Sequence, residues 1–98
     1  MLTKEQARER ALKEILKYWQ IEDDEPVIMD EDTMEEDFGW VFFYESRNFL
    51  DTKIYTYFLT DNAPIIVNKY DGSTHLTGTS GDIEAYIEEY RKELLQRS

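Results

Sequence analysis

The sequence has no cysteine and a single histidine. Without cysteine the chain can form neither a disulfide framework nor a thiolate zinc site, and it has no cysteine nucleophile. One imidazole cannot build a metal centre that needs two or more, so we interpret His75 as a surface or hairpin residue. The sequence therefore predicts no metal and no cofactor, and it fits a reducing compartment.

Long apolar runs and phosphate-binding loops are also missing. No run approaches the roughly 20 apolar residues that span a bilayer, and the N-terminal residues are charged, unlike a signal peptide. The four glycines form no nucleotide-binding motif. Basic residues are not interleaved with aromatic ones, as they are in nucleic-acid-binding proteins. We expect a cytoplasmic protein with neither a membrane nor a nucleic acid as its partner.

The chain does have enough apolar residues for one core. Of its 98 residues 41% are hydrophobic, including seven Tyr, five Phe and two Trp. This length corresponds to one ordinary domain, and no linker or repeat divides it. We expect a single domain over residues 1–98.

Basic residues are absent from the stretch between Tyr18 and Ser46, which holds eleven of the 22 acidic residues. The rest of the chain is formally neutral, so this stretch accounts for the net charge of −11. Such a field repels nucleic acid and anionic membranes and attracts basic protein surfaces. Ten of these acids fall on two predicted loops and are the candidate partner-binding residues: Glu22, Asp23, Asp24, Glu25, Asp30, Glu31, Asp32, Glu35, Glu36 and Asp37.

Three other roles of the acidic stretch have to be weighed against partner binding. A calcium loop starting at Asp30 would place Glu35 where glycine is required and Val41 where a bidentate Glu is required, which excludes it. Catalytic carboxylate pairs lie in clefts with opposed environments, whereas these acids crowd on loops. Solubility alone stays open as an explanation. Binding gains support from apolar neighbours that look exposed and could anchor an interface: Met29, Met34, Phe38 and Trp40.

Helices are predicted at both ends of the chain. Thr3 and Gln6 have the form of a capping box, and apolar residues then recur at helical spacing over residues 4–19. Asp82 can cap a closing helix whose apolar stripe begins at Ile83.

Four strands are predicted between these helices. The first, over residues 26–30, has Pro26 at its first position. The second, over residues 38–45, is almost entirely aromatic or β-branched and reads as a central strand buried on both faces. The last two, over residues 63–70 and 73–77, flank Asp71 and Gly72, which suit a type I′ hairpin turn. Residues 46–62 fit neither period and are predicted to form a long loop with a short strand.

These elements predict an α+β fold. The order α-β-β-β-β-α gives an antiparallel β-sheet of about four strands, with the N-terminal and C-terminal helices packed on one face. The other face would be open or partly covered by residues 46–62.

Three segments of the sequence carry a resemblance to a known family. DFGWVFFYES (37–46), APIIVNKYDGS (63–73) and LTGTSGDIEAYIEEY (76–90) resemble the immunity protein 35 family, also called YrhB-like domains, in order and in spacing. Asp61 departs from the glycine that commonly precedes the Asn-Ala-Pro block. Gly39 and Trp40 within the first segment are expected to be structural, since glycine permits close backbone approach and Trp fills the core.

This resemblance implies a function. Members of the family are bacterial cytoplasmic proteins, typically encoded beside a polymorphic toxin, that bind the toxin and occlude its active site. The acidic loops could mimic an anionic substrate at a basic cleft, such as that of a nuclease. A minor branch of the family resembles chaperones that act on unfolded polypeptides, for which residues 46–62 could supply the surface. The resemblance implies a binding protein rather than an enzyme.

Overall fold

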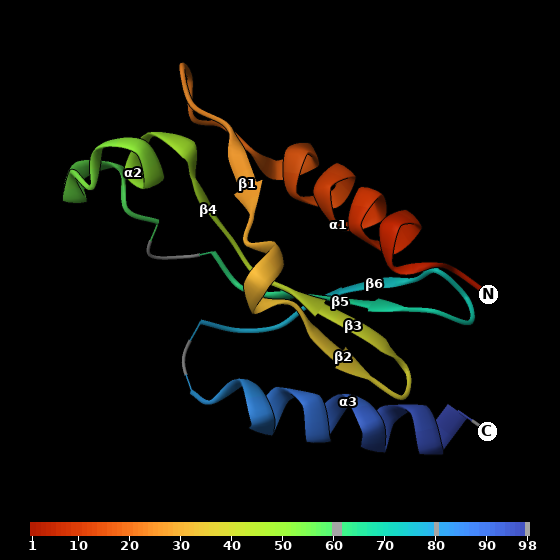
Figure 1. The fold of residues 1–98 in the computed structure, drawn as a ribbon. Coiled ribbons are helices and arrows are strands. Elements are labelled where there is room, and N and C mark those ends of the chain that lie inside the picture. Colours follow the sequence, from red (N-terminus) through yellow and green to blue (C-terminus); the bar gives the residue numbers. More distant parts are fainter. Residues whose placement is uncertain (60–61, 80, 98) are drawn as a thin grey trace.

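The fold was determined as a computed structural model that describes residues 1–59, 62–79 and 81–97 (Figure 1). Asp61, the departure from the family pattern, lies outside the described residues. The helices are α1 (Lys4–Tyr18), α2 (Arg47–Thr52) and α3 (Ile83–Arg97), with short 3-10 turns η1 (Asp30–Asp32) and η2 (Tyr55–Tyr57). The strands are β1 (Pro26–Ile28), β2 (Met34–Glu36), β3 (Gly39–Phe42), β4 (Tyr44–Ser46), β5 (Ile65–Asn68) and β6 (Thr74–Leu76).

The strands form two antiparallel sheets. The larger has the order β2-β3-β5-β6, with Trp40 opposite Val67 and Ile66 opposite His75. The smaller joins β1 and β4, with Pro26 opposite Ser46. The predicted strand 38–45 is thus interrupted at Phe43, where the chain passes from the larger sheet to the smaller one. The α+β class with helices at both ends is confirmed.

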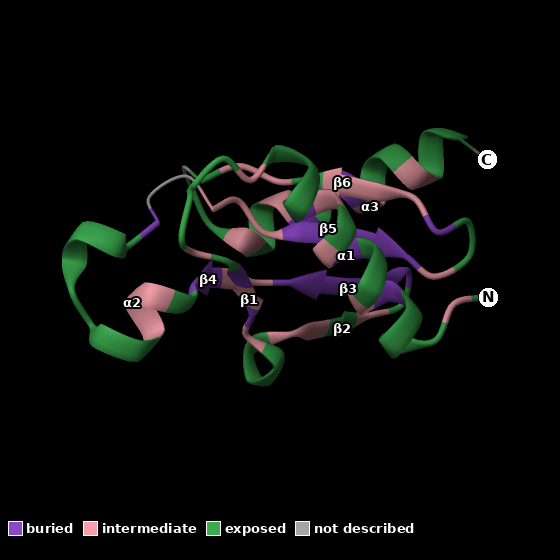
Figure 2. Ribbon diagram, turned by 90° about the horizontal axis from the view of Figure 1, so that it is seen from above, coloured by how far each residue is buried: buried purple, intermediate pink, exposed green. Residues whose placement is uncertain are grey.

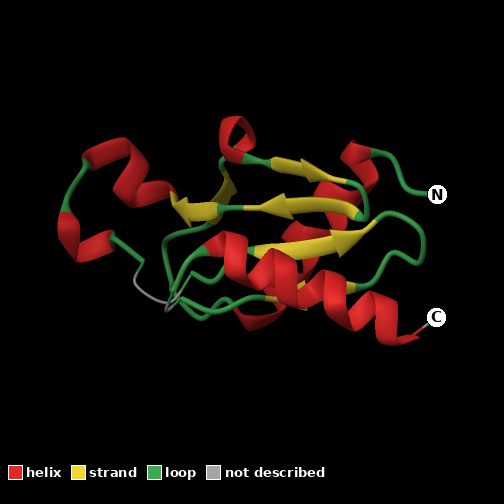
Figure 3. Cartoon of the chain, turned by 90° about the horizontal axis from the view of Figure 1, so that it is seen from below, coloured by secondary structure: helices red, strands yellow, loops and turns green. Residues whose placement is uncertain are grey.

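The terminal helices lie on opposite faces of the larger sheet, with α1 above and α3 below it (Figures 1 and 3). Side chains alternate along a strand, so Trp40 and Phe42 pack with α1 while Val41 packs with α3. Ile65 and Ile66 divide in the same way. The expectation that both helices pack on one face was wrong in this respect. Two cores result, one on each side of the sheet.

The helix starts follow the predicted caps. The Thr3 hydroxyl accepts a hydrogen bond from the Gln6 backbone N–H at 3.2 Å, and the Gln6 side chain accepts from Thr3 N at 3.0 Å. The carboxylate of Asp82 accepts from Glu84 N at 3.2 Å. The contacts to Gln6 N and Glu84 N satisfy first-turn N–H groups that lack a partner within the helix.

Three local predictions differ from the structure. The predicted loop over residues 31–37 contains β2, which pairs with β3 as a sheet edge. Residues 46–62 contain α2 and η2 in place of a short strand among their described positions. The β5–β6 connection spans Lys69–Ser73, and of its residues only Gly72 has a positive φ, so it is not a type I′ turn, which needs two.

Gly39 is required by the packing of β3 against β5. Its φ is +149°, and a Cβ added there would lie 2.0 Å from the carbonyl oxygen of Val67. The next residue, Trp40, is buried with 7% of its surface exposed. Both residues therefore have the structural roles predicted for them.

Residues 47–58 project from this body as a separate lobe, which we call the aromatic arm (Figure 2). The arm comprises α2 and η2, and neither contains a buried residue. The molecule measures 45 × 27 × 23 Å, with the arm at one end (Figures 1 and 2). None of the helices in the described part of the chain has the length and hydrophobicity of a membrane-spanning segment.

Candidate functional site

The ten predicted partner-binding acids do not form one surface. They fall into three groups along the chain, and each group contains an acid that pairs with an arginine of a different helix. Glu25 pairs with Arg47 of α2, Asp30 with Arg8 of α1, and Glu36 with Arg91 of α3. These pairs could not be predicted from the sequence, because the partners lie between 22 and 55 residues apart.

Asp24 has a structural role at the root of the aromatic arm. Its carboxylate accepts hydrogen bonds from the hydroxyl of Ser46 and from the backbone N–H groups of Asn48, at 3.1 Å, and Glu25, at 2.8 Å. Burial acts to raise the pKa of Asp24, but these hydrogen bonds outweigh it and hold the pKa below its ordinary value. Asp24 is therefore committed to the fold.

Besides the pair of Glu25 with Arg47, arginine contacts hold two more groups of carboxylates. Arg8 makes a two-pronged contact with Asp30, from Nε to Oδ1 at 2.6 Å and from Nη2 to Oδ2 at 3.1 Å. Arg91 contacts Glu36, Asp37 at 3.3 Å and Glu88 at 2.7 Å. The hydrogen bond with Glu88 raises the pKa of Arg91. Burial opposes this effect, but the charge of Asp37 adds to it, and the pKa lies above its ordinary value. These acids are partly neutralised within the protein.

The other five acids make no side-chain ion pair or hydrogen bond within the described residues: Glu22, Asp23, Glu31, Asp32 and Glu35. All five are exposed. Glu22 and Asp23 precede β1, beside the arm, whereas the other three follow β1, at η1 and β2. The prediction of a contact surface thus narrows to two separate acidic sites.

The apolar anchors predicted for this surface are mostly core residues. Phe38 is 3% exposed and Trp40 is 7% exposed. Phe38 packs edge-on against Tyr90 of α3, with ring centroids 4.9 Å apart. Met34 packs against the same core, and Met29 is half-buried. The expectation that Phe38 and Trp40 are exposed was therefore wrong.

Four exposed large apolar side chains lie close together in the sequence on the aromatic arm. Tyr55 is 80% exposed, and Ile54, Tyr57 and Phe58 are also exposed. The rings pack on one another, with Phe49 centred 4.9 Å from Phe58 and 5.9 Å from Tyr55. This self-packing explains why residues 46–62 fitted neither a helical nor a strand period.

Both ends of the arm are fixed to the body. At its start, Ser46 is fully buried, donates to Asp24 and accepts from Phe49 N at 3.1 Å, which caps α2. At its end, the backbone N–H of Leu59 donates to the buried carboxylate of Glu45 at 3.0 Å. The tip of the arm is thus exposed, while its root is hydrogen-bonded to buried residues of the body.

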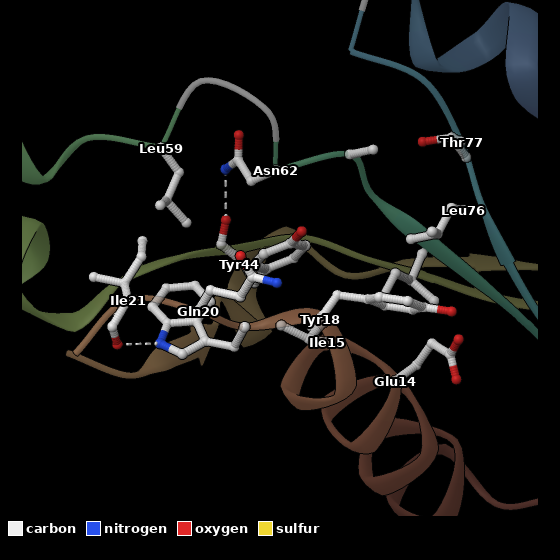
Figure 4. A pocket seen from close by; sticks show the side chains of 13 residues that line it. Glu14, Ile15, Tyr18, Gln20, Ile21, Tyr44, Leu59, Asn62, Leu76 and Thr77 are labelled. Atoms are coloured by element: carbon white, nitrogen blue, oxygen red, sulfur yellow. Dashed lines mark hydrogen bonds between the residues drawn. The ribbon is translucent and has the colours of Figure 1, made fainter. Parts of the chain in front are cut away.

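A groove of about 370 Å³ lies beside the root of the arm, between the end of α1 and strands β4 and β6 (Figure 4). Its lining includes the exposed apolar residues Tyr18, Ile21 and Leu76, with Leu59 and Asn62 on the side of the arm. The Asn62 side chain donates to the carbonyl oxygen of Tyr44 at 2.7 Å. No group of three or more potential metal ligands lies among the described residues.

Comparison with known proteins places the sequence in a family. The sequence matches immunity protein 35 over residues 5–93, which covers every strand, nearly all of α1 and most of α3. The chain belongs to the immunity protein 35 family. A curated relative is the uncharacterized protein YrhB of Escherichia coli (strain K12), 40% identical over 52 residues. That match covers 53% of this chain and 55% of the relative, so the chain spans about half the length of the relative.

No solved structure matches the chain. Within this immunity protein 35 chain, the segments that carry the family resemblance form β3, β4, β5, the last residue of β6 and the first half of α3. They are the strands and helix that build the body. The aromatic arm lies between the first two segments and outside both.

Proposed function

We propose that the chain neutralises a cognate bacterial toxin by binding the toxin domain and covering its active site. Its membership of the immunity protein 35 family carries this proposal. An immunity protein acts by binding another protein, so the chain would be a binding protein rather than an enzyme. The net charge of −11 supports a toxin domain with a basic active-site cleft, such as a nuclease.

The electrostatic part of the proposal rests on the five carboxylates without an internal partner. Glu22 and Asp23 form one site, and Glu31, Asp32 and Glu35 form the other. Exposed charges of one sign accelerate the approach of an oppositely charged partner, and salt screens that effect over about 8–10 Å. These sites would occupy the positions of an anionic substrate in the cleft of the toxin domain.

Co-expression in a bacterial host with the toxin domain encoded beside its gene tests the proposal. Protection of growth and a stable complex are expected. A toxin domain that is neither bound nor neutralised would refute the function.

Association kinetics test the electrostatic part separately. Glutamine or asparagine at Glu22, Asp23, Glu31, Asp32 and Glu35 should slow association roughly tenfold or more at low salt and flatten its salt dependence. A matched control carries glutamine at five exposed acids of α1 and α3: Glu5, Glu9, Glu84, Glu89 and Glu93. Equal association rates for the two variants would show that net charge alone attracts the toxin domain, and would contradict substrate mimicry by the two acidic sites.

The second candidate function is binding of unfolded polypeptides, which the exposed rings of the aromatic arm favour. This function predicts weak, promiscuous suppression of aggregation, for example of reduced insulin. A single tight partner with no such suppression would decide against it.

A further inference from the structure

The aromatic arm concentrates exposed apolar side chains on a part of the molecule that buries none. Ile54, Tyr55, Tyr57 and Phe58 are between 39% and 80% exposed, while α2 and η2 contribute no residue to either core. Folding of the body therefore gives no reason for these side chains to be apolar. A cluster of exposed aromatic residues at one end of a protein is a typical anchor for another protein.

The arm is preorganised for such contact. The rings of Phe49, Tyr55 and Phe58 pack mutually, with centroids between 4.9 and 6.1 Å apart. The ammonium group of Lys53 lies 5.6 Å from the centre of the Phe49 ring and covers part of the cluster. Aromatic side chains held in place before binding lose little conformational entropy when they enter a pocket.

Acidic residues lie directly beside the root of the arm. The backbone oxygen of Asp23 accepts a hydrogen bond from the Asn48 side chain at 2.9 Å, which joins the acidic loop to α2. Asp24 and Glu25 of the same loop are held by Ser46 and Arg47, whereas the exposed carboxylates of Glu22 and Asp23 make no ion pair or hydrogen bond with the other described residues and can meet a partner. The loop and the arm thus form one composite surface, with an aromatic tip and an acidic root.

We infer that this composite surface grips a folded protein domain that has an apolar pocket bordered by lysine or arginine. The inference rests on the proposed function for the existence of a protein partner. The composition of the surface indicates the partner. The rings would be buried in an apolar pocket, and the free carboxylates would pair with basic residues at its border. A second copy of the chain would place Glu22 and Asp23 in the field of another protein of charge −11. The exposure of the rings would suit an unfolded polypeptide as well, but their mutual packing favours a folded pocket, since promiscuous binders use flexible surfaces that repack.

The test measures how tightly two variants, each lacking one exposed tyrosine, bind the toxin domain encoded beside the gene. Tyr55→Ser removes a ring of the arm, and Tyr70→Ser removes an exposed ring of the β5–β6 turn. Tyr55→Ser should raise the Kd roughly tenfold or more, mainly through faster dissociation, and Tyr70→Ser should leave it unchanged. A double variant, Glu22→Gln with Asp23→Asn, should instead slow association.

The outcomes separate this inference from the function itself. If the wild-type chain neither binds nor neutralises the toxin domain, the proposed function fails. If the wild-type chain binds and Tyr55→Ser binds equally well, the arm is not the anchor and this inference alone fails. It also fails if Tyr55→Ser abolishes suppression of insulin aggregation with no effect on toxin binding, or if it dissociates a homodimer detected by sedimentation. Circular dichroism confirms that each variant is folded.

Discussion

The hydroxyl of Ser46 donates a hydrogen bond to the carboxylate of Asp24, and this contact joins the acidic loop to the first turn of the aromatic arm. Ser46 also caps α2 through Phe49 N. One buried side chain thus fixes the start of the arm and removes an acid from the candidate contact surface.

The Ser46–Asp24 contact should be measurable as a coupling energy. Ser46→Ala and Asp24→Ala should each lower the free energy of unfolding by about 1–2 kcal/mol, because a cap and a partly buried hydrogen bond are lost. The double variant should lose less than the sum of the two by about 0.5 kcal/mol or more. Urea unfolding measures all three. The matched control is the exposed contact from Ser73 to Asp71 (2.6 Å), where coupling should be smaller; additive losses at Ser46 and Asp24 would contradict the coupling.

The stabilising effect of Asp24 should depend on pH. Its pKa in the folded protein lies below the ordinary value of about 3.8, so its contribution is complete above that value and is lost as the pH falls through the lowered pKa. The stability difference between wild type and Asp24→Asn should therefore stay constant from pH 7 to 5 and shrink below about pH 4. Urea midpoints at several pH values measure it. Asp23→Asn controls for the loss of one negative charge from the same loop, and a difference that grows on acidification would overturn the assignment.

Gly39 and Gly81 allow steric contact to be separated from backbone strain. Both have positive φ values, of +149° and +103°, but only at Gly39 would an added Cβ meet another atom, the Val67 oxygen at 2.0 Å. Gly81→Ala should lower the free energy of unfolding by about 1–2 kcal/mol from strain. Gly39→Ala should lower it further, because β3 and β5 must separate. Equal thermal unfolding temperatures of the two variants would show that the close approach is unimportant.

The two-sided sheet predicts equal sensitivity at two neighbouring residues of β5. Ile65 packs with α1 and Ile66 with α3, and they are 0% and 2% exposed. Alanine at either position should lower the free energy of unfolding by about 2–5 kcal/mol, since each leaves a cavity. Ile54→Ala on the arm, where the side chain is 50% exposed, should have a much smaller effect. A small loss at either Ile65 or Ile66 would mean that one sheet face is open.

Local features of the sequence predicted much of the fold. The capping box at Thr3 and the acid at Asp82 located both helix starts, because a cap involves residues only a few positions apart. The run over residues 38–45 was correctly interpreted as buried on both faces over β3, although the strand is interrupted at Phe43. That same observation implies a helix on each face, whereas helix periodicity alone carries no information on which face each helix covers.

The site was less predictable than the fold, because its geometry depends on contacts that are distant in the sequence. Charge located the acidic loops, but Arg8, Arg47 and Arg91 neutralise part of them from three different helices. The aromatic arm was missed as an element. Its rings pack on one another, with Tyr55 and Phe58 against Phe49 of the short helix α2, so they follow no regular hydrophobic period.

The separation of the arm from both cores has an evolutionary consequence. Since α2 and η2 bury no residue, a mutation at the tip can alter the rings with little loss of folded protein. The body, by contrast, tolerates little change at β3 and β5. A gene with this architecture can follow a changing partner by substituting a few tip codons while the scaffold stays the same.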